Sequence, residues 1–401
     1  MAGQFGVAAA SGQVIDKYGR SRRSDFAIWW REIDQPLLMM VLVLMAIGAA
    51  AVAAASPASA RRLSTSTVQL ADLHFMALHL RWLVIGLVVL FGASLLAKDT
   101  ARRLGILIAA VSIAAMLLVP LIGTEVNGAR RWLNLGLSFQ PSSLLKAGFP
   151  ILLAWILSWR TRDPGLPVVE LSIVLIGLIA MLLMLQPDFG STMLYCGVWF
   201  VAILLTGLSV QRIAIVGAAG VFCFAAAYML YENARNRIDA FLGGGSAFDH
   251  VDLARRTLLE GGWTGTGFWQ GQRKMSLPEA HTDYIFSVIG EEFGLLACAI
   301  IIIVYLAILV RVLFRLVDEE DLFTVLAGAG LICQFGGQAF INILVNLQMF
   351  PSKGMTLPLI SYGGSSTVAM CLAIGLLLAI TRRNPFIERE RNPLTDKGEY
   401  A

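Results

Sequence analysis

The stretch PEAHTDY at residues 278–284 runs directly into the apolar segment IFSVIGEEFGLLACAIIIIVYLAILV at 285–310. The apolar segment is long enough to cross a bilayer, which takes about 20 apolar residues in a helix. Ionisable side chains therefore stand where a long soluble loop enters a membrane span. Charge so close to hydrocarbon is costly, and the default interpretation of it is a functional site.

The composition of the whole chain is typical of a membrane protein. Of its 401 residues, 57% are hydrophobic and only 14% are charged, whereas a soluble domain carries roughly a quarter charged residues. All five cysteines lie in apolar stretches without a metal-like spacing, so we interpret them as core residues. Segments long enough to span a bilayer fall near 37–56, 78–97, 104–123, 143–159, 168–186, 189–207, 211–230, 284–310, 322–349 and 361–381.

These segments predict an all-α polytopic membrane protein with ten transmembrane helices. A basic tail (1–35) precedes the transmembrane domain (36–383), and a second tail (384–401) follows it. The segment 231–283 becomes a large loop between the seventh and eighth spans. The first span ends in SPASA at 56–60, which resembles a signal-peptidase site, but the basic region before it is too long for a cleaved signal peptide.

Basic residues in the short loops predict the orientation. One side of the membrane receives most of them, from Lys17 to Arg31 before the first span to Arg382 and Arg383 after the last. The positive-inside rule then puts both termini in the cytoplasm and the loop 231–283 outside. The basic residues lie in loops between apolar spans, so nothing indicates a nucleic-acid partner. Four polar segments fall on the predicted outer face: 127–146, 186–191, 277–283 and 351–366.

The first two polar segments carry charge beside helix ends. Arg130, Arg131 and Lys146, near Trp132, suit a phosphate-bearing lipid substrate, although simple contact with lipid headgroups explains them equally well. Asp188 follows Gln186-Pro187 at a helix break, where an N-cap is the simpler interpretation. Its alternative role is to face the functional site.

The third segment ends the glycine-rich loop and carries Glu279, His281 and Asp283. A helix that begins near Thr282 would place Asp283, Ser287 and Glu291 on one face and carry polarity into the membrane. The alternative is that Asp283 only caps this helix, which would lower its pKa and leave a weak base.

The fourth segment combines PSKG at 351–354 with LPLISYGGSS at 357–366. Lys353, the hydroxyls of Ser361, Ser365 and Ser366, and the backbone amides of a helix N-terminus together make an anion cradle. An ordinary Pro/Gly break with small residues for close helix packing is the alternative.

The ninth span carries side-chain amides every four residues: Gln334, Gln338, Asn342 and Asn346. We expect these amides to bond to neighbouring helices, at ~0.6 kcal/mol each, or else to line a polar cavity. In the predicted topology every even-numbered span has its N-terminus outside, beside one of the polar segments. The helix dipoles there favour an anion, and a leaving pyrophosphate is one.

Four blocks, 127–146, 186–191, 277–295 and 351–366, resemble the SEDS family of cell-wall glycosyltransferases, which FtsW and RodA represent. Their order, their spacing and the ten-span layout also match, so the resemblance covers about residues 36–386. PEAHTD at 278–283 and LPLISYGGSS at 357–366 look more like the FtsW branch than the RodA branch, and a RodA-like elongation polymerase is the close alternative. The basic extension before the first span agrees.

The resemblance implies a peptidoglycan glycosyltransferase of the bacterial inner membrane that acts in cell division. Its substrate would be lipid II, the undecaprenyl-pyrophosphate-linked disaccharide-pentapeptide, polymerised on the outer leaflet. Asp283 aligns with the essential aspartate of the family, whose proposed role is general base. The resemblance assigns substrate contacts to Glu279 and His281 in the same block, and pyrophosphate contacts to Arg130, Arg131, Lys146 and Lys353.

The resemblance also implies partners. A class B penicillin-binding protein would supply the transpeptidase, alongside other division proteins and membrane lipids. A divalent cation such as Mg²⁺ or Mn²⁺ suits a leaving pyrophosphate, although the sequence contains no firm ligand set for one.

At one position the chain departs from the family pattern. The family usually has glutamate after Gln-Pro-Ser, three residues before the lysine, and here Ser143 stands in that place. A glutamate there would pair with Lys146 across one helical turn. Lys146 must therefore find another carboxylate, for which Asp188 and Glu125 are candidates, or pair with substrate phosphate.

Two other classes of protein compete with the enzyme. A transporter of lipid-linked precursors would also have broken helices and polar residues within its spans, but near the membrane midplane. The clustering of the polar segments at one predicted face favours chemistry at the surface. A non-catalytic scaffold would tolerate replacement of Asp283.

Overall fold

The computed structural model describes residues 25–66, 68–126, 129–134, 138–161, 163, 165–207, 209–243, 246–351 and 354–383. The chain divides into two units, Pro36–Thr381 and a smaller one made of Met1–Gln35 with Arg382–Ala401. In the smaller unit, α2 (Asp25–Glu32) is held to the other end of the chain by an ion pair of 3.5 Å between Glu32 and Arg382. All that follows concerns the larger unit.

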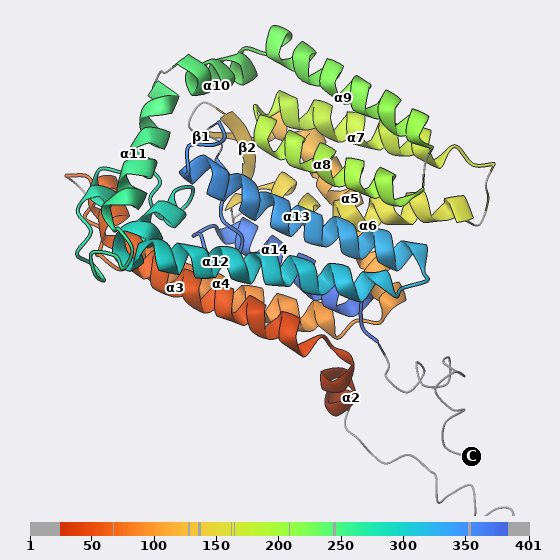
Figure 1. The fold of residues 1–401 in the computed structure, drawn as a ribbon, viewed down its shortest axis with the longest axis horizontal. Coiled ribbons are helices and arrows are strands. Elements are labelled where there is room, and N and C mark those ends of the chain that lie inside the picture. Colours follow the sequence, from red (N-terminus) through yellow and green to blue (C-terminus); the bar gives the residue numbers. More distant parts are fainter. Residues whose placement is uncertain are drawn as a thin grey trace, which may run out of the picture. The chain divides into compact units, whose positions relative to one another are not determined.

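Long apolar helices build the larger unit and lie side by side along one direction (Figure 1). They are α3 (Gln35–Leu63), α4 (His74–Ser94), α5 (Lys98–Ile122), α6 (Pro141–Ser158), α7 (Val168–Leu185), α8 (Phe189–Leu205), α9 (Val210–Leu230), α12 (Ile285–Val317), α13 (Leu322–Asn346) and α14 (Gly364–Ile380). Within the described residues, eight are long and apolar enough to cross a membrane, while α8 and α14 are apolar but only 17 residues long.

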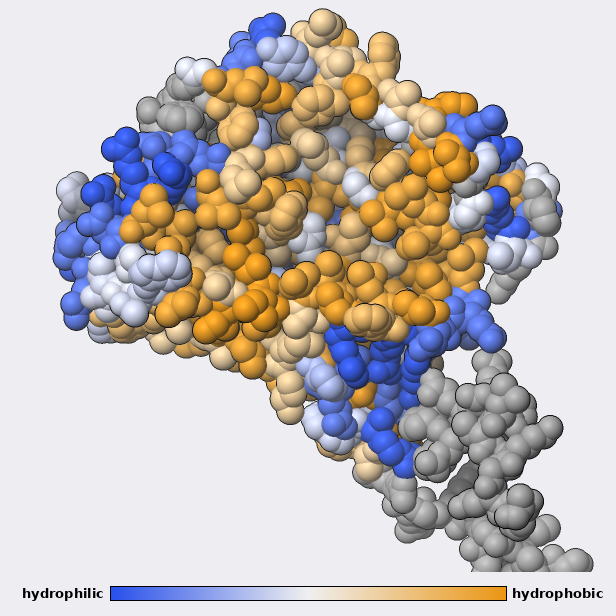
Figure 2. Space-filling view, in the orientation of Figure 1, coloured by the Kyte–Doolittle hydropathy of each residue, from blue (hydrophilic) through white to orange (hydrophobic). Residues whose placement is uncertain are grey.

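The surface agrees with a bilayer environment. Figure 2 shows hydrophobic residues over the side of the bundle, with hydrophilic residues gathered at its ends. Val88, Val174 and Phe314 are each about two-thirds exposed or more, which a soluble surface of this size would not tolerate. The predicted all-α, multi-pass membrane fold is confirmed, whereas the count of ten spans stays a prediction.

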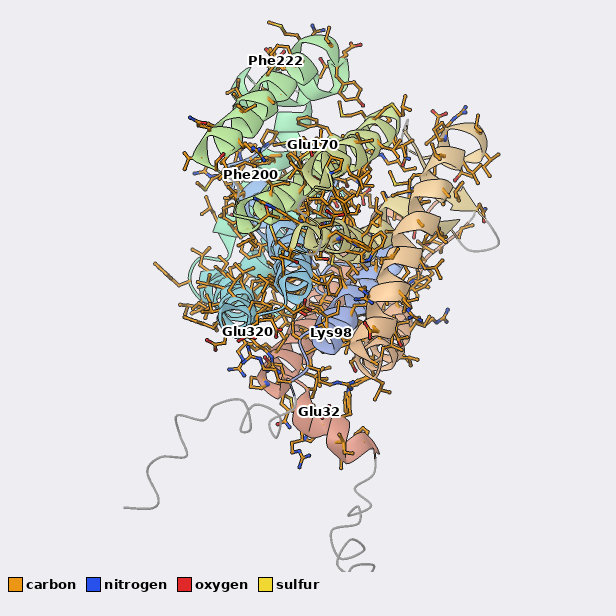
Figure 3. The ribbon with its side chains drawn as sticks, turned by 90° about the vertical axis from the view of Figure 1, so that its right-hand side faces the viewer. Glu32, Lys98, Glu170, Phe200, Phe222 and Glu320 are labelled. Atoms are coloured by element: carbon orange, nitrogen blue, oxygen red, sulfur yellow. The ribbon has the colours of Figure 1, made fainter. Side chains whose placement is uncertain are left out.

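Helices α6, α13 and α14 form the enclosed centre of the bundle. Nearly every residue of α14 from Thr367 to Ile380 is buried. Small residues allow this close packing: a Cβ at Gly148 of α6 would lie 2.6 Å from the backbone nitrogen of Ala109 in α5. At one end of the bundle, Lys98 of α5 pairs with Asp321 at 2.8 Å. Figure 3 views the bundle from this end and shows Lys98, Glu170 and Glu320.

The opposite end, which we call the α11 end, carries the non-helical elements and two further helices (Figure 1). A three-stranded antiparallel sheet of β1 (Thr124–Val126), β2 (Ala129–Asn134) and β3 (Ser138–Phe139) lies between α5 and α6. The sequence predicted only a loop here, because strands this short leave no clear alternation. The long loop contains α10 (Glu232–Gly243), α11 (Ser246–Glu260) and the short helix η2 (Arg273–Met275).

The predicted helix from Thr282 begins later and is interrupted. Helix α12 starts at Ile285 and breaks at Gly294, whose φ of 82° lies in the left-handed region. Loop residues take over its hydrogen bonds: Thr266 N–H donates to the Glu291 carbonyl at 2.9 Å, and Leu295 N–H donates to the Gly262 carbonyl at 2.9 Å. The remaining helix, 295–317, is ~34 Å long at 1.5 Å per residue and still crosses a bilayer.

Candidate active site

Asp283 lies at the end of a tight turn between η2 and α12. Glu279 has a φ of 51°, and its carbonyl accepts hydrogen bonds from the backbone N–H groups of Thr282 (3.1 Å) and Tyr284 (3.3 Å). The Thr282 hydroxyl donates to the Glu279 carboxylate at 2.9 Å. Asp283 itself is half-buried. It therefore precedes α12, and Ser287 and Glu291 do not continue a helical face that includes it.

The Asp283 carboxylate lies against the fourth polar segment. A Cβ added to Gly354 would be 3.3 Å from the Asp283 Oδ2 atom, so only a residue with almost no side chain leaves this oxygen undisturbed. The structure thus brings together two segments that are about 70 residues apart in the sequence. Lys353, the predicted pyrophosphate contact, lies outside the described residues, directly before Gly354.

Two amides of α13 hold the backbone at Asp283. The side-chain N–H groups of Asn342 and Asn346 both donate to the Asp283 carbonyl, at 2.8 Å and 3.1 Å. Asn342 also donates to the Met355 carbonyl at 2.6 Å, and Asn346 accepts from the Ser287 hydroxyl at 2.7 Å. Both side chains are buried. The bond to Ser287 of α12 joins neighbouring helices, as the sequence predicted, whereas the bonds to the Asp283 and Met355 carbonyls hold loop backbone.

The next amide along α13 reaches Lys146. Gln338 donates to the Thr356 carbonyl at 2.8 Å and accepts from the Lys146 ammonium group at 2.8 Å. Lys146 is only 6% exposed, so this contact replaces water that a buried cation has lost. The fourth amide, Gln334, is buried, and neither its nitrogen nor its oxygen has a partner among the described residues.

Asp188 caps α8, as the simpler interpretation of the sequence predicted. Its carboxylate accepts the backbone N–H of Ser191 at 3.1 Å and the Ser191 hydroxyl at 2.8 Å. Its charge also acts on the Lys146 ammonium group. Glu125, the other candidate partner of Lys146, pairs with Arg130 at 3.5 Å. In place of the missing glutamate at Ser143, Lys146 therefore has Gln338 as its contact and Asp188 as its counter-charge.

The two adjacent arginines of β2 have different surroundings. Arg131 donates from Nε to the Gln186 carbonyl at 2.9 Å and from Nη2 to the Pro187 carbonyl, which joins β2 to the turn before α8. Gln186 in turn donates at 3.4 Å to the Met116 carbonyl, which lacks its helical partner because residue 120 is proline. Arg130 is a half-exposed side chain beside Glu125 and remains accessible at the surface.

His281 is enclosed beside the turn. Its Nδ1 atom lies 2.7 Å from the Ser59 hydroxyl of α3, and its ring centroid lies 4.3 Å from that of Phe75 and 5.4 Å from that of Tyr362. Burial lowers the pKa of His281 to about 4, against a weaker opposing effect of Glu279, so the ring is neutral at pH 7. The predicted substrate contact would need this ring to become accessible.

The serines of the fourth polar segment fix its course. The Ser361 hydroxyl donates to the Thr282 carbonyl at 2.6 Å and accepts from the Leu357 N–H at 2.8 Å. Ser366 lies 2.9 Å from the Thr356 hydroxyl. Among the described residues no side chain caps the N-terminus of α14, where Ser365 and Ser366 stand, half-buried. The first amides of α14 thus offer the kind of anion site that a helix N-terminus provides.

Sequence reasoning missed a second polar cluster, in which two buried glutamates hold the loop. Glu291 accepts backbone N–H bonds from Arg273 (2.7 Å) and Lys274 (2.9 Å). Glu292 accepts from the Gly271 N–H and forms a buried ion pair with the Lys274 ammonium group. We call Glu291, Glu292 and Lys274 the loop anchor. The available signal was the Glu-Glu pair inside an apolar stretch.

The described residues offer no evident metal centre. Among them, no group of three or more His, Cys, Asp or Glu side chains is placed to hold an ion. The groups that the structure offers at the site are the half-buried carboxylate of Asp283, the buried ammonium group of Lys146 and the N-terminus of α14.

Comparison with known proteins identifies the family. A family model described as cell cycle protein (FtsW, RodA and SpoVE) matches residues 35–385. A Caulobacter vibrioides relative named as a probable peptidoglycan glycosyltransferase FtsW is 34% identical over 92% of this chain and 94% of its own length. A Methylococcus capsulatus relative of the same name is 35% identical over 74% of this chain and 78% of its own length.

Solved structures agree. One comes from work on the coordination of polymerization and crosslinking by a peptidoglycan synthase complex, with a TM-score of 0.72 and 27% identity over 87% of this chain and 97% of that one. The rod shape determining protein RodA of Thermus thermophilus matches with a TM-score of 0.63 and 26% identity, over 88% of this chain and 97% of its own. The chain belongs to the FtsW, RodA and SpoVE family of cell cycle proteins.

Proposed function

We propose that this protein is a peptidoglycan glycosyltransferase of the FtsW type, which polymerises lipid II into glycan strands. The relatives that it matches over most of its length are named for this activity. The observation that carries the proposal is the setting of Asp283. Its carbonyl is held by two buried amides, and its carboxylate faces Gly354 in a segment rich in groups that bind anions.

Asp283 acts as the general base in the proposed reaction. Its carboxylate takes the proton from the 4-hydroxyl of the acceptor sugar while that oxygen attacks the anomeric carbon of the donor. The bond between the anomeric carbon and the pyrophosphate oxygen breaks, and undecaprenyl pyrophosphate leaves with both electrons. One displacement converts the α-linked donor into a β-1,4 bond. A half-buried carboxylate suits this role because it can reach substrate and is still partly shielded from water.

The cationic residues assist the leaving group to different degrees. Lys146 is buried next to Gln338, and its charge is partly balanced by Asp188. Arg131 is committed to the turn before α8, so its contribution to substrate is to shape the site. Arg130, at the surface, and Lys353 are the proposed direct contacts to the pyrophosphate. The α14 N-terminus adds a positive dipole end.

The proposal includes location and partners. The positive-inside pattern supports cytoplasmic termini in the bacterial inner membrane, with the α11 end outside, where lipid II is polymerised. A division protein of this type would work at the septum with a class B penicillin-binding protein. The similarity to a chain from a peptidoglycan synthase complex supports a partner that crosslinks the strands.

The test is polymerisation of labelled lipid II by the purified protein with its class B partner, transpeptidase blocked. Wild type and Glu260→Gln should both make glycan strands, because Glu260 is an exposed carboxylate of α11 to which no substrate contact is assigned. Asp283→Ala should make none. Strands from Asp283→Ala would refute the role of Asp283. No strands from wild type, with folding and partner verified, would refute the enzyme and favour a transporter or scaffold.

A further inference from the structure

A cavity of about 480 Å³ lies at the α11 end, apart from the Asp283 turn. Its wall includes the last turns of α3 and the loop 269–275. Its lining side chains include Pro57, Arg61, Asp72, Trp269, Gln272 and Lys274. Pro57 and Arg61 are four residues apart and share one face of α3, whereas Ser59, which contacts His281, is two residues from each and faces away from them. The cavity and the Asp283 turn thus lie on opposite sides of one helix.

Trp269 gives the cavity a rigid apolar face. Its indole N–H donates at 3.1 Å to the Ala53 carbonyl, which is free to accept because Pro57 provides no N–H four residues on. Its backbone N–H donates to the Glu292 carboxylate. Phe268 stacks on one side of the indole, with ring centroids 4.8 Å apart, and 52% of the Trp269 side chain stays exposed.

The backbone at Trp269 is also strained. Its φ of 65° lies in the left-handed region, which a bulky residue rarely adopts. Such a conformation persists only where the surroundings fix it, and it occurs preferentially at ligand sites. Here the loop anchor fixes it: Glu292 binds Trp269, Gly271 and Lys274 together. The loop is thus built to hold an exposed indole in one orientation.

The charges of the side chains that line the cavity indicate which class of ligand it can bind. Arg61 lies 3.8 Å from Asp72, and Lys274 is neutralised by Glu292. The cavity therefore has no surplus of positive charge to attract a phosphate headgroup. It offers paired polar groups on Arg61, Asp72 and Gln272 beside an aromatic face. A neutral saccharide matches both features. Its hydroxyl groups can hydrogen-bond to the polar side chains, and the C–H face of its ring can pack on the indole.

We propose that this cavity binds sugar residues of the growing glycan strand, as a product subsite that keeps the strand attached between additions. This inference rests on the proposed function and adds a binding site to it. A strand that leaves Asp283 would pass the outer end of α3, about one helix diameter or ~10 Å, before it reaches the indole of Trp269. Loss of the subsite would then shorten the strands.

Binding is measured first, on the full-length protein in neutral-lipid nanodiscs, with a β-1,4-linked N-acetylglucosamine tetrasaccharide as the probe, which is neutral and has the same type of linkage as the strand. Trp269→Ala and Gln272→Ala should weaken binding about tenfold, since each loses a ligand contact. Gln272→Ala alters an exposed side chain and so tests the proposal even if Trp269→Ala misfolds. The matched control is Trp263→Ala, a more exposed tryptophan of the same loop that does not line the cavity.

The outcomes separate the subsite from the enzyme. Tetrasaccharide binding that is about tenfold weaker in the cavity variants and unchanged in Trp263→Ala, together with shorter strands from the cavity variants, supports the proposal. No binding to a wild type that polymerises normally would overturn the subsite and leave the enzyme standing. Binding of inorganic pyrophosphate that competes with the tetrasaccharide and is lost in Arg61→Ala would overturn it in favour of a phosphate site. Tetrasaccharide binding without polymerisation would overturn only the proposed function.

Discussion

Two polar regions stand only eight residues apart in the sequence, and they differ in what their carboxylates do. At the loop anchor, Glu291 and Glu292 are fully buried and accept backbone N–H bonds and the charge of Lys274. At the turn, Asp283 is half-buried, and the buried amides hold its carbonyl. Fully buried carboxylates that accept loop N–H groups stabilise a loop, whereas a half-buried carboxylate on a fixed backbone can meet a substrate.

The largest effect on stability should come from the loop anchor. Lys274→Met leaves Glu292 charged and buried without its partner, which should lower the free energy of unfolding by about 3–5 kcal/mol. Thermal unfolding in detergent measures this. The double variant Lys274→Met/Glu292→Gln should recover part of the loss, since no buried charge remains. Equal stability of Lys274→Met and wild type would contradict the role of the anchor.

The turn should respond to acid through His281. Its folded-state pKa of about 4 lies below the ordinary value of 6.5, so the unfolded chain binds more protons between these values. The contribution of the neutral His281 ring to the free energy of unfolding is fully present above pH 6.5. It decreases as the pH falls, and ~3 kcal/mol of it is lost below pH 4. Unfolding of wild type and His281→Gln across pH 4 to 7 checks this, because the variant should lack that share of the slope. Parallel curves would show that His281 is not responsible.

The amides of α13 provide an internal comparison. Asn342→Leu removes three side-chain hydrogen bonds and leaves the carbonyls of Asp283 and Met355 with fewer partners, at a cost of about 1–3 kcal/mol. Polymerisation should fall with it, because the turn loses its fixed geometry. Gln334→Leu, on the same stripe, should be neutral or stabilising, since Gln334 is buried with neither amide atom bonded within the described residues. Equal losses of stability in Asn342→Leu and Gln334→Leu would show that the bonds from Asn342 to the turn have no special role.

The smallest effect should come from the half-exposed ion pair of Arg130 and Glu125. Exposed ion pairs contribute about 0–1 kcal/mol to the free energy of unfolding, so Glu125→Gln should leave the melting temperature almost unchanged. Arg131→Ala should be clearly less stable, because two carbonyls in the turn before α8 lose their donor. The melting temperatures of the two variants, measured side by side, test this ranking. A larger decrease in melting temperature for Glu125→Gln than for Arg131→Ala would contradict it.

The sequence predicted the membrane helices and the polar segments well, because both depend on local composition. The all-α multi-pass fold and the N-cap at Asp188 follow from hydropathy and from residue preferences at helix ends. The stripe from Gln334 to Asn346 was visible as a four-residue repeat. Its partners were not, because three of the amides bond to Lys146 and to backbone carbonyls at 283 and 355–356, far away in the sequence.

The features that the sequence did not predict depend on the long loop. The break at Gly294 requires 262–267 to replace helical hydrogen bonds, and no local pattern announces such an insertion. The loop anchor requires Lys274 to reach Glu292 across 18 residues. The short strands at 124–126, 129–134 and 138–139 form because three brief segments pair, although none has the alternation of an independent strand.

The most direct test of the comparison measures glycan synthesis and melting temperature together for Asp283→Asn and Glu291→Gln, two changes that each remove one negative charge. The account predicts that Asp283→Asn melts like wild type and loses polymerisation by at least about 100-fold, as expected for a general base. Glu291→Gln should melt at a lower temperature, and its remaining folded fraction should still make strands. Polymerisation by Asp283→Asn, with a well-folded Glu291→Gln that makes none, would contradict the account and move the base to Glu291.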